Sequence, residues 1–157
     1  MKGTCVASHA CLRAHCPSSS GPAIAALGDA TLGLRLADVS LAFRVTRDEE
    51  YVHLQLAWSG QTFDLGERNH NYLLLTLARR RLKDAMANRS PASSGWLHTD
   101  ELAQGLLMSR TQLNTDVFRI RQQFTTIGVL DAGTIIERRQ PTGQIRIGVS
   151  KATIDFL

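Results

Sequence analysis

The order of helical and strand-like patterns in the last third of the chain constrains the fold most. Apolar residues recur at helical spacing in two segments between residues 99 and 127, separated by a short turn. Two alternating strands follow between residues 134 and 149. A helix, a turn, a longer helix and a hairpin are the parts of a winged helix-turn-helix, whose hairpin is called the wing. The pattern therefore predicts an α+β fold.

The residues ahead of these helices are predicted to supply a small antiparallel sheet. Residues 51–58 and 61–65 alternate between apolar and polar side chains around the turn Ser59-Gly60. An earlier alternation, at 32–36 and 39–45, is interpreted as a hairpin with its turn at Ala37-Asp38.

Capping residues indicate where three helices begin and end. Asn69, Thr99 and Ser109 are the expected N-caps, and Gly128 is the expected left-handed residue after the last helix. The basic cluster at residues 79–83 is interpreted as a solvated helix end that suits the helix dipole. A phosphate contact is the alternative for that cluster.

The longest expected helix, at about 110–127, has one apolar and one polar face. Its apolar stripe, which must face the core, consists of Leu113, Val117, Ile120, Phe124 and Ile127. The opposite face and its flank carry Thr111, Asn114, Thr115, Arg119, Arg121 and Gln122. Arginine, amide and hydroxyl groups donate to bases and phosphates, so these residues are predicted to contact DNA. An ordinary solvated helix face would have a similar composition.

The hairpin expected at about 134–149 carries positive charge at its tip. Arg138, Arg139 and Thr142 lie at or beside the turn that Pro141 and Gly143 shape. A structural hairpin with solvated arginines is one interpretation. Because the hairpin follows a helix-turn-helix directly, we favour a wing that docks on DNA together with the helix.

The first residues differ in composition from the rest of the chain. Residues 1–30 lack periodicity and include the Ser- and Pro-containing stretch at 16–22, so a disordered leader is expected. All 3 cysteines lie there, at Cys5, Cys11 and Cys16. They lack the close pairing typical of zinc sites, so no metal site is predicted. With neither an export signal nor a disulfide framework, we expect a cytoplasmic protein.

Bulk composition and missing motifs exclude several functions. The net charge of +4 suits a polyanionic partner without requiring one. No apolar run is long enough to span a bilayer, so no membrane partner is expected. The sequence has no phosphate-binding glycine loop, dinucleotide fingerprint, nucleophile motif or paired acids on a recognisable scaffold. We therefore expect no enzymatic activity and no cofactor.

These motifs make the chain similar to a known family of DNA-binding domains. Leu113-Asn114-Thr115-Asp116-Val117-Phe118-Arg119-Ile120-Arg121, with the wing segments Ile135–Arg139 and Thr142–Ile147, resembles the OmpR/PhoB-type effector domain of bacterial response regulators. The resemblance implies that Arg119 contacts a base or a groove of the DNA and that Arg121 contacts the DNA backbone. It also implies that Arg138 or Arg139 provides the contact made by the wing. The chain differs from the family in two places. Its turn from Gly105 to Ser109 is short, and Asp116 occupies a position at which the family's side chain often faces DNA.

A second resemblance concerns the junction before the first helix. Phe43–Val52 and Asn71–Arg79 are similar to the winged-helix segment that follows a forkhead-associated (FHA) domain in some bacterial proteins. On this interpretation residues 31–47 form a β-hairpin like the end of an FHA domain, and residues 48–157 form the winged-helix domain. The phosphothreonine-reading segments of FHA domains are missing from the chain, so that activity is not expected.

Two functions follow as hypotheses. The first is a bacterial transcriptional regulator that binds double-stranded DNA through the helix at about 110–127 and the wing, with a homodimer on DNA left open. The second is a non-catalytic protein-interaction adaptor that keeps the fold without the DNA surface. Asp116 and Phe118 motivate the second hypothesis, because a carboxylate repels phosphate and an exposed aromatic ring suits a protein partner.

Overall fold

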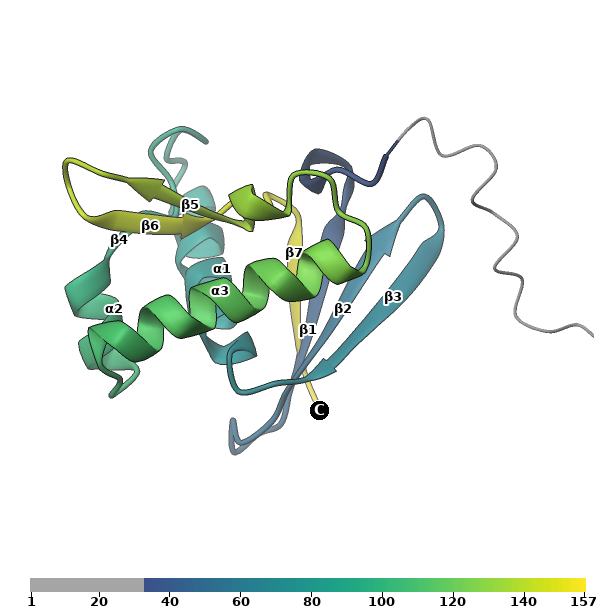
Figure 1. Cartoon of the computed structure of the whole chain (residues 1–157), viewed down its shortest axis with the longest axis horizontal. Helices are drawn as coiled ribbons and strands as arrows, with labels where there is room; N and C mark the ends of the chain where they lie inside the picture. Colours follow the sequence, from purple (N-terminus) through teal and green to yellow (C-terminus); the bar gives the residue numbers. More distant parts are fainter. Residues whose placement is uncertain (1–32) are drawn as a thin grey trace, which may run out of the picture. The chain divides into compact units, whose positions relative to one another are not determined.

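The computed structural model describes residues 33–157, and Figure 1 shows their arrangement. The expected leader at 1–30 and the cysteine segment lie outside the described residues. The elements are η1 (Leu36–Asp38), β1 (Ser40–Val45), β2 (Val52–Trp58), β3 (Gln61–Glu67), α1 (Asn71–Met86), β4 (Leu97–His98), α2 (Thr99–Gly105), α3 (Arg110–Thr126), η2 (Ala132–Ile135), β5 (Ile136–Arg139), β6 (Gln144–Ile147) and β7 (Ala152–Phe156). The predicted α+β class is confirmed, and residues 33–157 form three α-helices and two sheets.

The first sheet has the strand order β3-β2-β1-β7. Its strands β1, β2 and β3 are antiparallel as predicted, and the turn at Ser59-Gly60 has positive φ at both residues. The sequence did not predict β7, which pairs parallel to β1. The sheet is therefore mixed.

The hairpin predicted at residues 32–45 is wrong in its first half. β1 already has a neighbour on each edge, β2 and β7, so no edge is left for another strand. Residues 36–38 form a 3₁₀ turn instead. The Leu36 amide donates to Asp131 Oδ1 at 2.9 Å, and the Leu34 carbonyl accepts from the Leu130 amide at 2.9 Å. This segment is thus tied to the residues after α3.

The second sheet has the order β4-β6-β5, and its β5–β6 hairpin is the one predicted from the sequence. Its first strand begins later than expected, because Thr134 and Ile135 belong to the 3₁₀ turn η2. The two-residue strand β4 pairs with β6. The hairpin is therefore part of a three-stranded sheet.

Two of the predicted N-caps are wrong and one is confirmed. His70 and His98 occupy the N-cap positions of α1 and α2 without a side-chain cap bond. Asn69 precedes the first of these positions, and Thr99 is the first residue of α2. Ser109 does cap α3, since its side chain accepts from the Gln112 amide.

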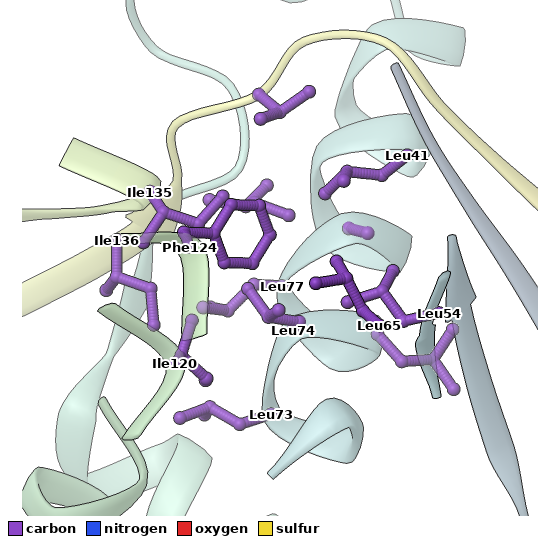
Figure 2. Close-up of a cluster of buried hydrophobic side chains, with 14 of the residues drawn as sticks. Leu41, Leu54, Leu65, Leu73, Leu74, Leu77, Ile120, Phe124, Ile135 and Ile136 are labelled. Carbon is purple, nitrogen blue, oxygen red and sulfur yellow. The ribbon is translucent and has the colours of Figure 1, made fainter. Parts of the chain in front are cut away.

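The core lies on both sides of α1, as Figure 2 shows. Leu73, Leu74 and Leu77 of α1 belong to the same buried cluster as leucines of the first sheet and residues of α3 and the hairpin. The predicted stripe of α3 is buried from Leu113 to Phe124, with Ile127 partly buried against it. Burial of this stripe turns the opposite, polar face of α3 outwards.

Within residues 33–157, none of the helices combines the length and apolarity needed to cross a bilayer.

Candidate nucleic-acid interface

The predicted DNA contacts on the outward face of α3 are all polar or cationic side chains. Thr111, Thr115, Arg119 and Gln122 are all exposed. The Thr115 hydroxyl donates to the Thr111 carbonyl at 3.0 Å, so it is held against its own helix. This face is long enough, over about three turns, to lie in a major groove.

Asp116, the single acidic residue of α3, does not lie on this face. Its side chain is buried, with the residue 7% exposed, and its Oδ1 is 3.8 Å from Arg119 Nη1. The family resemblance placed Asp116 where side chains often face DNA, and its burial contradicts that expectation. Burial keeps the carboxylate from solvent while Arg119 itself remains exposed.

Two hydrogen bonds join α3 to the β5–β6 hairpin. Arg138 Nη2 donates to Asn114 Oδ1 at 3.0 Å, and Arg121 Nη2 donates to the Ile136 carbonyl at 2.9 Å. Burial lowers the pKa of Arg121, and the nearby charge of Arg138 lowers it further. Arg121 is thus a half-buried link between helix and hairpin, although the family resemblance implied a DNA-backbone contact.

The outer face of the hairpin holds an aromatic ring between two arginines. The guanidinium carbon of Arg139 lies 4.1 Å, and that of Arg146 4.5 Å, from the centroid of the Trp96 ring. Arg146 Nε also donates to Glu137 Oε2 at 2.6 Å. Sequence reasoning missed Trp96, because its position opposite Arg146 depends on the pairing of β4 with β6.

The tip of the hairpin is attached to the start of α2. The Gly143 carbonyl accepts from both the amide and the hydroxyl of Thr99, at 3.0 and 3.1 Å. This explains why Thr99 does not act as a side-chain cap. Thr142 is exposed at the tip, and its hydroxyl lies 3.1 Å from Gln144 Oε1.

A cleft of about 240 Å³ separates the first turns of α3 from the hairpin. Its lining includes Arg110, Asn114, Arg138, Arg139 and Gln140. Arg110 was not predicted as a site residue, although it follows the capping Ser109 directly. Its Nη2 is 3.0 Å from Asp100 Oδ1, so it enters the cleft as one half of an exposed ion pair.

The basic cluster of α1 has partners inside the domain. Arg79 pairs with Glu49 at 2.9 Å, Arg80 pairs with Asp84 at 3.3 Å, and Arg81 donates to the Ile147 carbonyl. These contacts account for the cluster without a phosphate contact, although Arg81 is half-buried and not solvated as expected.

Three acids lie near this surface: Asp116, Glu137 and the exposed Asp100, which pairs with the cleft-lining Arg110. Asp116 is buried and Glu137 is turned to the hairpin's outer face with Arg146, so neither divides the surface formed by α3 and Arg138. Among residues 33–157, no group of three His, Cys, Asp or Glu side chains is placed to hold a metal ion. Comparisons with models of protein families, with curated proteins and with solved structures each gave no match to this chain.

Proposed function

We propose that this chain is a DNA-binding transcriptional regulator, with α3 entering the major groove and the β5–β6 hairpin acting as the wing. The observation that carries the proposal is that Asp116 and Glu137 both lie off the surface of α3 and Arg138, while the exposed Asp100 at its edge is paired with Arg110. The side chains that remain exposed carry hydroxyl, amide and guanidinium groups. These groups donate hydrogen bonds to bases and phosphates.

We infer further that the domain is an OmpR/PhoB-type winged helix of the kind that follows FHA domains. The succession of three antiparallel strands, three helices and a hairpin supports this family. The bonds that join Arg138 to Asn114 and Arg121 to Ile136 support joint docking of helix and hairpin, because they fix the two elements relative to each other.

The test is a selection from random duplex DNA with the purified chain, followed by binding titrations at several salt concentrations. We expect an enriched sequence motif, with affinity that falls steeply as salt rises because bound cations are released from the DNA. Failure to enrich any duplex, or binding that salt does not weaken, would contradict the proposal.

A second candidate is a protein-interaction adaptor, favoured by Phe118, which is 64% exposed on the flank of α3. Affinity capture from a bacterial lysate should then recover a protein partner that Phe118→Ser loses and that Thr115→Ser retains. Enrichment of DNA with both variants, and of no partner, would exclude the adaptor.

A further inference from the structure

A second cleft, of about 140 Å³, lies between α1, the loop at residues 89–94 and the segment that leads from β6 to β7. Most of its wall is apolar: Ala78, Leu82, Ala85, Pro91, Ile147 and Val149 contribute to it. An apolar cavity of about this size, roughly 150 Å³, accommodates a benzene ring in another protein. The cleft therefore fits one six-membered ring.

The charged groups of this cleft are both arginines. Arg81 and Arg89 line it, and neither Asp nor Glu does. Arg81 donates a hydrogen bond to the Ile147 carbonyl, and burial lowers the pKa of Arg81. Arg89 is more exposed, at 55% of its side chain, and its ion pair with Asp84 is loose: its Nε lies 3.8 Å from Asp84 Oδ1, beyond hydrogen-bond distance. Asp84 is already held by Arg80 and by the Gly95 amide.

We propose that this cleft binds a small monocyclic aromatic carboxylate. Its ring packs against Leu82, Ile147 and Val149, and its carboxylate pairs with Arg89. Apolar walls favour the ring through burial, and the lone accessible cation selects an acid over a neutral molecule of the same shape.

The cleft also has a physical connection to the hairpin. Pro91 and Ser94 line it, and their carbonyls accept from Arg146 Nη1 at 2.9 and 3.4 Å. Arg146 in turn stacks on Trp96, as Arg139 does. A ligand that contacts Pro91 and Ser94 would thus alter the support of the hairpin's arginines. This coupling rests on the proposed function, because the hairpin is then the wing; binding in the cleft does not.

Methyl-resolved NMR of the full chain tests the binding, with sodium benzoate, toluene and sodium acetate as probes. We expect benzoate to shift the methyl signals of Ala85, Ile147 and Val149 in a saturable way, toluene to shift the same signals more weakly, and acetate to shift none. If benzoate leaves these signals unchanged, the proposal is overturned. It is also overturned if they move with protein concentration alone, because a second copy of the chain is then the occupant.

Three variants assign the interaction to its parts. Arg89→Gln should weaken benzoate about tenfold, the value of one charge-assisted hydrogen bond, and leave toluene unchanged. Ala85→Phe, at an exposed position that tolerates a larger side chain, should block both probes. The exposed Arg68→Gln serves as the control and should change neither. Equal losses of benzoate in Arg89→Gln and Arg68→Gln would overturn the role of Arg89.

The coupling is measured separately, by titrating the selected DNA duplex with and without saturating benzoate. A changed DNA affinity in the chain, absent in Ala85→Phe, supports the coupling; an unchanged affinity overturns it and leaves the site intact. A chain that binds benzoate but no DNA refutes the proposed function alone.

Discussion

Arg119 and Arg138 are both exposed, yet they are held in different ways, and this difference predicts different effects on DNA binding. Arg119 projects from the outward face of α3 beside Asp116, whereas Arg138 reaches Asn114 from the hairpin. We expect Arg119→Ala to cost about 1–3 kcal/mol at one base position and to relax sequence preference there. Titrations against a set of single-base variants of the selected site measure this.

The hairpin arginine should behave as a phosphate contact. Arg138→Ala is expected to weaken all duplexes about equally and to reduce the salt slope by about 1, because one fewer counterion is released. Arg44→Ala, at an exposed position of β1 in the first sheet, is the matched control. A loss confined to one base in Arg138→Ala would assign that arginine to base reading instead.

Trp96 should stabilise the hairpin through the two arginines that stack on it. Each cation–π contact at a partly exposed site is worth about 0.5–1 kcal/mol, so Trp96→Leu should lower the free energy of unfolding by about 1–2 kcal/mol. Urea unfolding measures the loss. In the Trp96→Leu background, Arg139→Gln should cost less than in the unchanged chain, because only its hydrogen bond to the Ala92 carbonyl at 3.1 Å remains to be lost, while Arg138→Gln should cost the same in both. Additive losses for Trp96 and Arg139 would mean that the stacking is not stabilising.

At this scale the sequence predicts which residues are exposed better than it predicts their partners. The helical period correctly placed Thr111, Thr115, Arg119 and Gln122 outwards. It could not show that Arg121 bonds to Ile136, because that contact depends on where the hairpin packs. Asp116 was misplaced for the same reason: a position at the edge of the apolar stripe is buried or exposed according to its tertiary neighbours.

The three helices end in the same hydrogen-bonding motif, with a left-handed residue at Asn88, Leu107 and Gly128. Glycine and asparagine adopt this conformation readily, but leucine does not. Leu107 is also 95% exposed, so its side chain contributes little packing in the domain. Leu107→Gly should therefore raise the free energy of unfolding by about 0.5–1 kcal/mol, as measured by urea unfolding.

The reverse substitution on α3 provides the comparison. Gly128→Ala, at φ +90 with open space around its Cβ, should destabilise the chain by about 1 kcal/mol. If Leu107→Gly is destabilising instead, the leucine side chain has a contact that outweighs its backbone strain.

Asp84 connects α1 to the loop that precedes β4, and this connection should depend on pH. Its pKa lies below the usual 3.8 chiefly because the Gly95 amide donates to the carboxylate, with Arg80 and Arg89 adding to the effect. A lowered pKa in the folded chain means that the ionised form stabilises the fold above pH 3.8 and that this stabilisation is lost as the pH falls through the folded-state pKa. Asp84→Asn should therefore be destabilising at about pH 7, and the difference should shrink below about pH 3.8. Urea unfolding at both pH values tests this, with exposed Asp100→Asn as the control; a pH-independent difference would contradict it.

Elements with strong local signals were predicted, and those that depend on distant pairing were not. The stripe of α3, the Ser109 cap and the β5–β6 hairpin follow from neighbouring residues. The strand expected at 32–36 has a suitable alternation but finds no free edge, because β7 occupies the place beside β1. Asn69 and Thr99 do not cap their helices because each lies one residue away from the N-cap position, which His70 and His98 occupy.

For the whole molecule, the chain's last strand determines how the two sheets are joined. After β6 in the second sheet, residues 148–151 lead directly into β7, which completes the first sheet beside β1. Figure 1 shows this passage in yellow, between the hairpin and the first sheet. Parallel pairing between β1 and a strand more than a hundred residues later leaves no local signal in the sequence.

Gly148 is the residue at which this passage is packed most tightly. Among the glycines of residues 33–157 without a positive φ, it should tolerate substitution least. A Cβ there would lie 2.0 Å from the Thr134 carbonyl oxygen, a backbone atom, while the Gly148 amide donates to the Ile135 carbonyl at 2.8 Å. A side chain would have to separate η2 from the segment that follows β6 and leads to β7. Gly148→Ala should therefore lower the free energy of unfolding by about 2–4 kcal/mol.

Gly133 is the matched control for this substitution, since it lies in the neighbouring η2 turn and a Cβ added there would meet nothing within 4 Å. Gly133→Ala should be neutral or slightly stabilising, because alanine restricts the unfolded chain. Urea unfolding, followed by Trp58 fluorescence in the first sheet and Trp96 fluorescence beside the second, should give one shared transition for Gly148→Ala. Two separate transitions would mean that the sheets unfold independently and that the passage through Gly148 does not couple them.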